Sequence, residues 1–437
     1  MSMLEMGYLS FPILLGMIFL RAPIGLAMML CGIGGLYFSM GGSTMFMAKL
    51  KSETYTTFSS YSLSIIPMFL LMGQFATVSG MSKALFRAAE SWLGHRRGGV
   101  AMAAVGACAG FGSICGSSLA TAATMSRVAL PELRRYGYSG GFSTATLAAG
   151  GTLGILIPPS VVLVIYAILT EQNIAKLFLA AFVPGILAAI GYMITISIYV
   201  RAYPDAAGTR EPVPMAERMR ALVDVWPVLL VFGLVVGGIY LGWFTPTEGA
   251  AVGAAGTGLI ALVSGTLTWQ NLRDSIIATA TSTAMIFFII LGAGFYNGFL
   301  ALSQVPQELS NWVVGQGFSP WTVLWLILIF YLVFGCLMDS LSMILLTIPI
   351  FFPVISALDF GMSPEHVAIW FGILVLIVVE VGLITPPVGM NLFIINAMDR
   401  ETPMTDTYKA VIWFVGSDLV RVTILVLFPA ITLFLLP

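Results

Sequence analysis

Long apolar runs recur along nearly the whole chain and are separated by short connectors that hold most of the charged residues. A helix needs about 20 predominantly apolar residues to cross the hydrocarbon core of a bilayer. Only 9% of the 437 residues are charged, against about 25% in an average soluble domain. The pattern excludes a water-soluble globule and predicts an all-α polytopic membrane protein without a large extramembrane domain. We expect spans near residues 6–20, 23–40, 61–79, 138–169, 177–200, 224–243, 247–264, 276–302, 366–397 and 408–436.

Two further apolar stretches, 99–130 and 321–358, are interrupted by small and polar residues. The interruptions read ICGSSLATAAT at 114–124 and CLMDSLSMILLT at 336–347. Each stretch forms either two spans or one re-entrant hairpin, and both arrangements return the chain to the side it entered from. Arms of about 15 residues reach roughly 22 Å, less than the roughly 30 Å of a bilayer core. The arm length therefore favours re-entrant hairpins near 99–135 and 321–358, with tips inside the membrane.

The basic residues are distributed asymmetrically over the connectors. Lys and Arg collect in cytoplasmic loops because moving them across the membrane is unfavourable. If the connector at 80–98 is cytoplasmic, counting crossings leaves Lys49, Lys51 and Lys176 outside and Arg421 within the last span. Both termini then face outward. The other basic residues all lie inside, and they are Arg21, Lys83, Arg87, Arg96, Arg97, Arg127, Arg134, Arg135, Arg201, Arg210, Arg218, Arg220, Arg273, Arg400 and Lys409.

The two halves of the chain resemble each other at an offset of 223 residues, which small insertions increase to 224 and then to 228. Gly116 and Asp339 are 223 residues apart, and the Gly-x-x-x-Pro-Pro motif at Gly154–Pro159 returns at Gly382–Pro387. Further pairs are Pro23 and Pro246, Ser117 and Ser340, Thr124 and Thr347, Gly137 and Gly361, and Ser139 and Ser363. Each half crosses the membrane an odd number of times, so the second copy is inverted relative to the first.

Inverted repeats are typical of secondary transporters, which alternate between two states around one site near the bilayer midplane. We therefore expect a first repeat at 1–201 and a second repeat at 222–437. The proline-rich and charged segment at 202–221 is predicted to be a cytoplasmic linker.

Each Gly-x-x-x-Pro-Pro motif lies inside an apolar run, near 138–169 and 366–397. Proline removes a backbone donor and disfavours helical geometry in the residue before it. The helices are therefore expected to break there and to free carbonyl groups, which hydrocarbon tolerates only when they are buried, solvated or bound to a cation. A structural kink is the alternative, but two copies at matching repeat positions favour a binding site.

Hydroxyl groups collect at the first predicted tip, where Ser117, Ser118, Thr121 and Thr124 offer oxygen ligands suited to Na⁺. Packing of small residues between helices is the alternative role for these side chains. At the second tip, Asp339 could bind a cation, cap a helix beginning at Ser340, or face a polar cavity.

Three other polar features have structural as well as functional interpretations. Glu380 is either a functional intramembrane carboxylate or a partner in an interhelical hydrogen bond. Asp418 and Arg421 have the i, i+3 spacing of a helical ion pair. Thr245-Pro246-Thr247-Glu248 has the spacing of a capping box with proline at the first helical position.

Several functional classes lack their motifs. No HExxH sequence, histidine cluster or Walker-type nucleotide loop occurs, so we expect neither an enzyme nor direct use of ATP. No basic cluster is interleaved with aromatic residues, so we expect no nucleic-acid partner. The histidines lie singly in connectors and the cysteines in apolar surroundings that favour core packing; they are His95, His366, Cys31, Cys108, Cys115 and Cys336.

The longest motifs resemble those of one transporter family. In the first half they are ICGSSLATAATMSRVALPELRRYGYS at 114–139 and AAGGTLGILIPPSVVLVIYAILTEQNIAKLF at 148–178. In the second half they are MDSLSMILLTIPIFFPV at 338–354 and GLITPPVGMNLF at 382–393. Together they resemble the large membrane subunit of tripartite ATP-independent periplasmic (TRAP) transporters, the DctM type. The resemblance covers nearly the whole chain.

This resemblance implies an elevator-type transporter whose mobile domain contains both hairpins and both broken helices. It implies Na⁺ as the coupling ion and no other cofactor. The implied Na⁺-binding residues are Ser113, Gly154, Ile157, Pro159, Asp339, Ser340, Gly382, Thr385 and Val388. The implied residues around a carboxylate substrate are Ser117, Ser118, Thr121 and Thr385.

The resemblance also implies two partners, a small four-helix membrane subunit of the DctQ type and a periplasmic substrate-binding protein of the DctP type. The chain would lie in the lipid of the bacterial inner membrane with both termini in the periplasm. A stand-alone Na⁺/dicarboxylate symporter is the close alternative, and an intramembrane enzyme and a passive channel are more distant ones. No side chain of the expected site identifies the organic acid.

Overall fold

The computed structural model describes residues 2–40 and 43–436, and every regular element within these ranges is helical. This confirms the predicted all-α class. The helices of the first half are α1 (Met3–Phe19), α2 (Ile24–Met40), α3 (Ser43–Ser59), α4 (Ile65–Val78), α5 (Met81–Leu93), α6 (Gly99–Cys115), α7 (Ser118–Arg135), α8 (Gly140–Leu156), α9 (Val161–Thr170) and α10 (Ile174–Ala202).

A segment with one short 3-10 turn, Pro204–Ala206, leads into the second half. Its helices are α11 (Met215–Val223), α12 (Trp226–Phe232), α13 (Gly238–Tyr240), α14 (Pro246–Val263), α15 (Trp269–Ser303), α16 (Val305–Gly315), α17 (Pro320–Gly335), α18 (Ser340–Ser356), α19 (Pro364–Gly382), α20 (Met390–Met398), α21 (Met404–Leu427) and α22 (Pro429–Leu433). A π-helical turn at Gly233–Gly237 joins α12 to α13. The capping box predicted at Thr245 and Glu248 is confirmed, because each side chain bonds the backbone N–H of the other.

Four helices, α10, α15, α19 and α21, are long and apolar enough to cross a membrane by themselves. Three bent pairs pass the same test when each pair is taken as one span, which gives up to seven spans in the described chain. Five further apolar helices, α1, α2, α6, α17 and α18, have 17 residues or fewer. The structure is therefore that of a multi-pass membrane protein, with several helices shorter than the apolar runs that predict them.

The helices are interrupted at both Pro-Pro motifs. In the first half, α8 ends at Leu156 and α9 begins at Val161, with a bend of 44° between them. In the second half, α19 ends at Gly382 and α20 begins at Met390. Neither proline of a motif can donate a helical hydrogen bond, so the chain leaves the helix where the sequence predicts.

Short turns separate the helices of both predicted hairpins. Gly116 and Ser117 connect α6 to α7, and Gly116 has a left-handed φ of 64° that favours glycine. Residues 336–339 connect α17 to α18 in the same way. Within each pair the two helices pack against each other.

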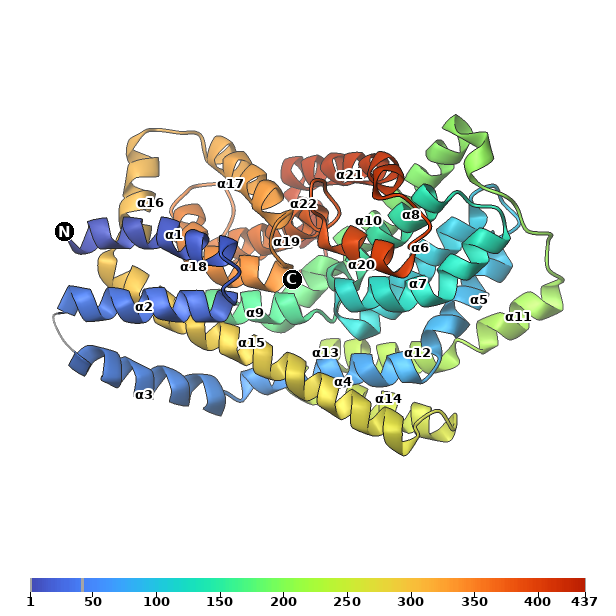
Figure 1. Cartoon of the computed structure of the whole chain (residues 1–437), viewed down its shortest axis with the longest axis horizontal. Helices are drawn as coiled ribbons and strands as arrows, with labels where there is room; N and C mark the ends of the chain where they lie inside the picture. The colour runs from blue at the N-terminus through green and yellow to red at the C-terminus, as the bar shows by residue number, and fades with distance from the viewer. Residues whose placement is uncertain (1, 41–42, 437) are drawn as a thin grey trace.

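The two halves interlock. Helix α2 packs against α15, and α14 packs against α4. The hairpin helices cross over as well, since α7 contacts α20 and α18 contacts α9. The long α15 runs beside α2 over one part of its length and beside α4 over another (Figure 1). Under the offset found in the sequence, the α2–α15 contact corresponds to the α14–α4 contact. The α7–α20 contact corresponds in the same way to the α18–α9 contact.

Four connectors between the predicted spans contain helices, namely α3, α5, α11 and α16. Hydropathy does not reveal such segments because polar residues alternate with apolar ones along them. In α5, for example, Met81 and Phe86 are buried while Lys83 and Arg87 are exposed. In α3, Lys49 and Glu53 form an ion pair of 2.7 Å one turn apart.

Candidate functional site

A small cavity of about 110 Å³ lies where both hairpin turns meet the interrupted helices. The two turns supply its polar lining. Ser117 and Ser118 come from the first turn, and Asp339 and Ser340 come from the second. Apolar residues of α4, α8, α9, α15 and the α19–α20 break complete the wall. The structure thus brings together predicted residues that lie more than 200 positions apart in the sequence.

The first turn is built on close backbone contacts. Ser117 caps α7, where its hydroxyl accepts a hydrogen bond of 3.4 Å from the Ala120 N–H. A Cβ built on Gly154 would lie 2.8 Å from the Ser117 carbonyl oxygen, and it would also collide with the Thr121 hydroxyl. A Cβ on Gly116 would lie 3.1 Å from the Pro159 carbonyl oxygen. Four predicted site residues therefore surround this turn.

The other predicted residues of the first half lie on either side of this cluster. Ser113 is buried in the last turn of α6, and its hydroxyl donates to the Gly110 carbonyl at 2.8 Å. Ile157 is buried directly after α8, and its N–H still bonds the Leu153 carbonyl. Thr121 is buried in α7, and its hydroxyl has no hydrogen-bond partner in the described chain.

In the second turn, Asp339 caps α18 and accepts a hydrogen bond of 3.1 Å from the Ser342 N–H. The predicted capping role is therefore confirmed, and the same carboxylate also lines the cavity. Gly382 touches α17, because a Cβ built on it would lie 2.5 Å from the Gly335 carbonyl carbon. Thr385 and Val388 lie in the segment between α19 and α20, and the Thr385 hydroxyl donates to the Val381 carbonyl at 2.6 Å. Neither of these last two residues lines the cavity.

Glu380 connects α19 to the second turn. Its side chain is fully buried, and its Oε1 accepts a hydrogen bond of 2.5 Å from the Ser340 hydroxyl. The interhelical hydrogen bond considered for Glu380 is therefore present. The other carboxylate oxygen, Oε2, has no hydrogen-bond partner among the described residues.

A buried polar network joins α8, α10 and α21. Asp418 and Arg421 form the predicted i, i+3 ion pair at 2.8 Å. The Tyr192 hydroxyl donates to Asp418 Oδ2 at 2.8 Å and lies 3.0 Å from the Thr152 hydroxyl. The network links both halves of the chain, and only its ion pair was visible in the sequence.

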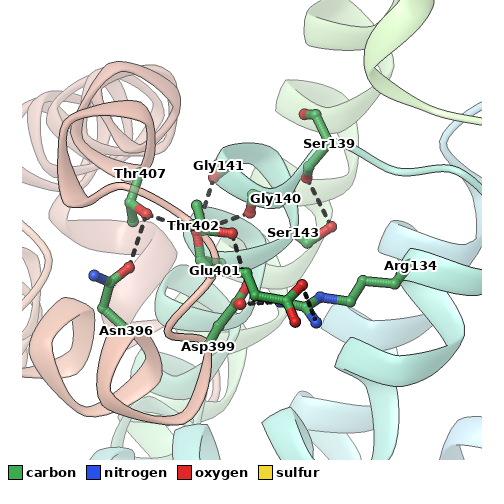
Figure 2. Close-up of polar contacts among 11 residues, drawn as sticks. Arg134, Ser139, Gly140, Gly141, Ser143, Asn396, Asp399, Glu401, Thr402 and Thr407 are labelled. Atoms are coloured by element: carbon green, nitrogen blue, oxygen red, sulfur yellow. Dashed lines mark hydrogen bonds and ion pairs between the residues drawn. The ribbon is translucent and has the colours of Figure 1, made fainter.

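A second polar network joins the end of α7 to the segment after α20 (Figure 2). Arg134 forms ion pairs with Asp399 and Glu401, the second at 3.0 Å. The Thr402 hydroxyl donates to Asp399 Oδ2 at 2.8 Å, and Asp399 itself is buried. Sequence reasoning missed this contact because nothing in the pattern pairs residues 265 positions apart.

Metal-binding clusters of His, Cys, Asp and Glu are absent from residues 2–40 and 43–436. All four cysteines are free and buried, which confirms the prediction of core packing. The cavity lining offers hydroxyl and carboxylate oxygens, which are hard ligands and suit a hard cation better than a soft transition-metal ion.

Comparison with known proteins supplies independent information. Residues 11–431 match the family model described as the DctM component of the tripartite ATP-independent periplasmic transporter. The C4-dicarboxylate TRAP transporter large permease protein DctM of Pseudomonas aeruginosa is 38% identical over 392 residues, which cover 88% of each chain. The isethionate TRAP transporter permease protein DctMQ of Oleidesulfovibrio alaskensis is 30% identical over 97% of this chain and 66% of its own length.

Among solved structures, the YdaH transporter of Alcanivorax borkumensis matches with a TM-score of 0.66. The alignment covers 88% of both chains at 15% sequence identity. At this level of identity the likeness concerns the fold alone.

Proposed function

The chain belongs to the DctM component family of TRAP transporters, and from this premise we propose that it takes up a carboxylate by Na⁺-coupled alternating access. The observation that carries the proposal is the cavity between the two hairpin turns, beside both helix breaks. One site shared by two related halves is what alternating access around a midplane needs.

In this proposal Na⁺ binds beside each turn. The first ion is held by Ser113, Gly154, Ile157 and Pro159, and the second by Asp339, Ser340, Gly382, Thr385 and Val388. The close packing of Gly154 against the first turn and of Gly382 against α17 supports it, because it brings the backbone of each hairpin into contact with the helix that ends at the neighbouring break. Bound cations also compensate Asp339, a carboxylate that otherwise lines the cavity without a basic partner in the described chain.

The substrate lies between the turns near Ser117, Ser118, Thr121 and Thr385. Helices α7 and α18 both begin at the cavity, and the N-terminus of a helix favours negative charge. A carboxylate therefore suits the site once Na⁺ has neutralised Asp339. Two relatives are named for C4-dicarboxylates and for isethionate, which are both organic anions. In this proposal the site accepts an organic anion, and the other components of the transporter select which one is carried.

Movement follows an elevator scheme in which both hairpins and both broken helices shift together. Leu70 of α4 and Ile286 of α15 form the wall of the cavity outside this group. The mobile group would slide along these two helices, which pack against their counterparts from the opposite half. The halves at 1–201 and 222–437 act as inverted repeats, the segment at 202–221 is a cytoplasmic linker, and both termini face the periplasm.

The chain acts with a small four-helix membrane subunit and a periplasmic substrate-binding protein. The name of the DctMQ relative, which is longer than this chain, supports the first partner. The test is reconstitution into liposomes with and without both partners, under an imposed Na⁺ gradient. We expect uptake of an organic acid only with all three components and inward Na⁺. Uptake by the chain alone would instead identify a stand-alone symporter.

A further inference from the structure

Helix α11 presents an apolar stripe that no part of the described chain covers. Met215, Met219, Leu222 and Val223 are 45–64% exposed and share one helical face. An amphipathic helix of this kind lies in the plane of a membrane interface with its apolar face toward the acyl chains. Trp226, just beyond the helix, is also exposed, as expected of a residue at headgroup level.

A large cleft of about 990 Å³ lies behind α11, between this helix, α5 and the end of α7. Two ion pairs line it, Arg210 with Glu90 at 3.2 Å and Arg135 with Glu132 at 3.4 Å. Both pairs neutralise part of the lining, and the Arg210–Glu90 pair joins the linker to α5.

The remaining charges of the cleft are unpaired within the described chain. They are three cations, Lys83, Arg87 and Arg220, and two carboxylates, Glu217 and Asp224. Lys83 and Arg87 lie one turn apart on the same face of α5, and the other three belong to or directly follow α11. The cleft thus presents positive and negative groups side by side.

We propose that this cleft binds a phospholipid whose headgroup carries both a phosphate and an ammonium group, as in phosphatidylethanolamine. The phosphate contacts Lys83, Arg87 and Arg220, and the ammonium contacts Glu217 and Asp224. Phe86, Val128 and Ala221 supply apolar lining for the glycerol and the start of the acyl chains. The exposed stripe of α11 favours a lipid over a soluble phosphate compound, because it places the mouth of the cleft at headgroup depth.

Native mass spectrometry of the purified full chain tests this assignment. Phosphatidylethanolamine, phosphatidylglycerol and phosphatidylcholine of identical acyl chains are added separately at equal concentration. We expect at least fivefold more bound phosphatidylethanolamine than either other lipid. The variant Lys83→Gln/Arg87→Gln/Arg220→Gln should lose this excess. The control Arg96→Gln/Arg97→Gln/Arg201→Gln removes the same charge from basic residues outside the cleft and should keep it. Equal binding of the three lipids, or an unchanged excess in the first variant, overturns the proposal.

Two further measurements test the ammonium contact and the choice of a lipid over a soluble phosphate compound. Glu217→Gln/Asp224→Asn should abolish the preference for phosphatidylethanolamine over phosphatidylglycerol while phosphatidylglycerol still binds; a retained preference contradicts the ammonium contact. This arm also decides the question if the basic variant does not fold. O-phosphoethanolamine and inorganic phosphate, at the lipid concentration, should leave the lipid bound. Displacement by either would show that a soluble phosphate compound occupies the cleft.

Discussion

Gly112 in α6 touches Gly154 in α8 backbone to backbone, since a Cβ built on Gly112 would lie 2.5 Å from the Gly154 Cα. Gly335 and Gly382 make the corresponding contact between α17 and α19. Helices can approach this closely only where side chains are absent. The two contacts therefore set the separation between each hairpin and the helix that ends at the neighbouring break.

Replacing Gly382 with alanine should destabilise the protein, because the new methyl group forces α17 and α19 apart. Overpacking of this kind costs about 1–3 kcal/mol. Thermal unfolding in detergent, with and without Na⁺, measures both the loss and any change in the ion response. Gly34→Ala is the control, because a Cβ at this position of α2 meets no atom within 4 Å. Equal melting temperatures for the two variants would contradict the contact.

The network at Arg134 yields a second prediction. Asp399 is buried, so Arg134→Gln leaves a carboxylate without its cation. Loss of one partner of a buried pair costs about 3–5 kcal/mol, but Arg134 is 37% exposed and we therefore expect roughly 1–3 kcal/mol. Arg135→Gln, at a pair whose Arg side chain is 70% exposed, should cost less than about 1 kcal/mol.

A double-mutant cycle identifies the partner. Adding Asp399→Asn to Arg134→Gln should restore part of the lost stability, because the uncompensated charge disappears. Chemical unfolding of the two single variants and the double variant supplies the coupling energy. Strictly additive losses would mean that Arg134 and Asp399 do not interact.

Stability should depend on pH through Glu90, which lies in α5 outside the candidate spans. Burial raises the pKa of Glu90 above its usual 4.5; Arg210 opposes this shift, Glu132 adds to it, and Tyr136 and Arg135 oppose it. The folded protein therefore holds this proton more tightly than the unfolded chain does. The resulting stabilisation is complete below pH 4.5 and is lost as pH rises through the raised pKa.

The variant Glu90→Gln removes this dependence. Its stability relative to the unchanged protein should increase as pH rises from acidic to neutral, because glutamine has no charge to bury. Arg210→Gln should do the opposite, since it removes the largest influence that lowers the pKa of Glu90. Melting temperatures across this pH range measure both variants, and parallel curves for all three proteins would disprove the assignment.

The sequence predicts the positions where the helices break better than it predicts what packs against them. The Gly-x-x-x-Pro-Pro motifs locate both interruptions because the effect of proline on its own helix is local. Gly112 and Gly335, by contrast, look like ordinary small residues until the partner glycine is known. Arg134 and Asp399 are likewise unremarkable in sequence, because their contact depends on how α7 and α20 cross.

Thr385→Pro tests the second proposed ion site. The Thr385 N–H donates to the Gly382 carbonyl at 3.0 Å, and proline cannot make this bond. We expect Na⁺-dependent uptake to be abolished while membrane insertion, measured by the yield in the membrane fraction, is unchanged. Thr385→Ser retains the N–H and hydroxyl and should remain active. Unchanged uptake in the proline variant would remove this residue from the site.

Asp339 combines capping with a charge at the cavity, and two substitutions separate these contributions. Asparagine caps helices about as well as aspartate, whereas alanine costs about 1 kcal/mol at such a position. Asp339→Asn should therefore keep the melting temperature of the unchanged protein in the absence of Na⁺, and Asp339→Ala should lower it. If the carboxylate also binds Na⁺, Asp339→Asn should raise the Na⁺ concentration for half-maximal stabilisation about tenfold, which corresponds to roughly 1.4 kcal/mol. Ser117→Ala, which removes the cap of α7 without changing charge, should alter that concentration far less. An unchanged Na⁺ response in Asp339→Asn would restrict Asp339 to the cap of α18, because the amide preserves that hydrogen bond and removes only the charge.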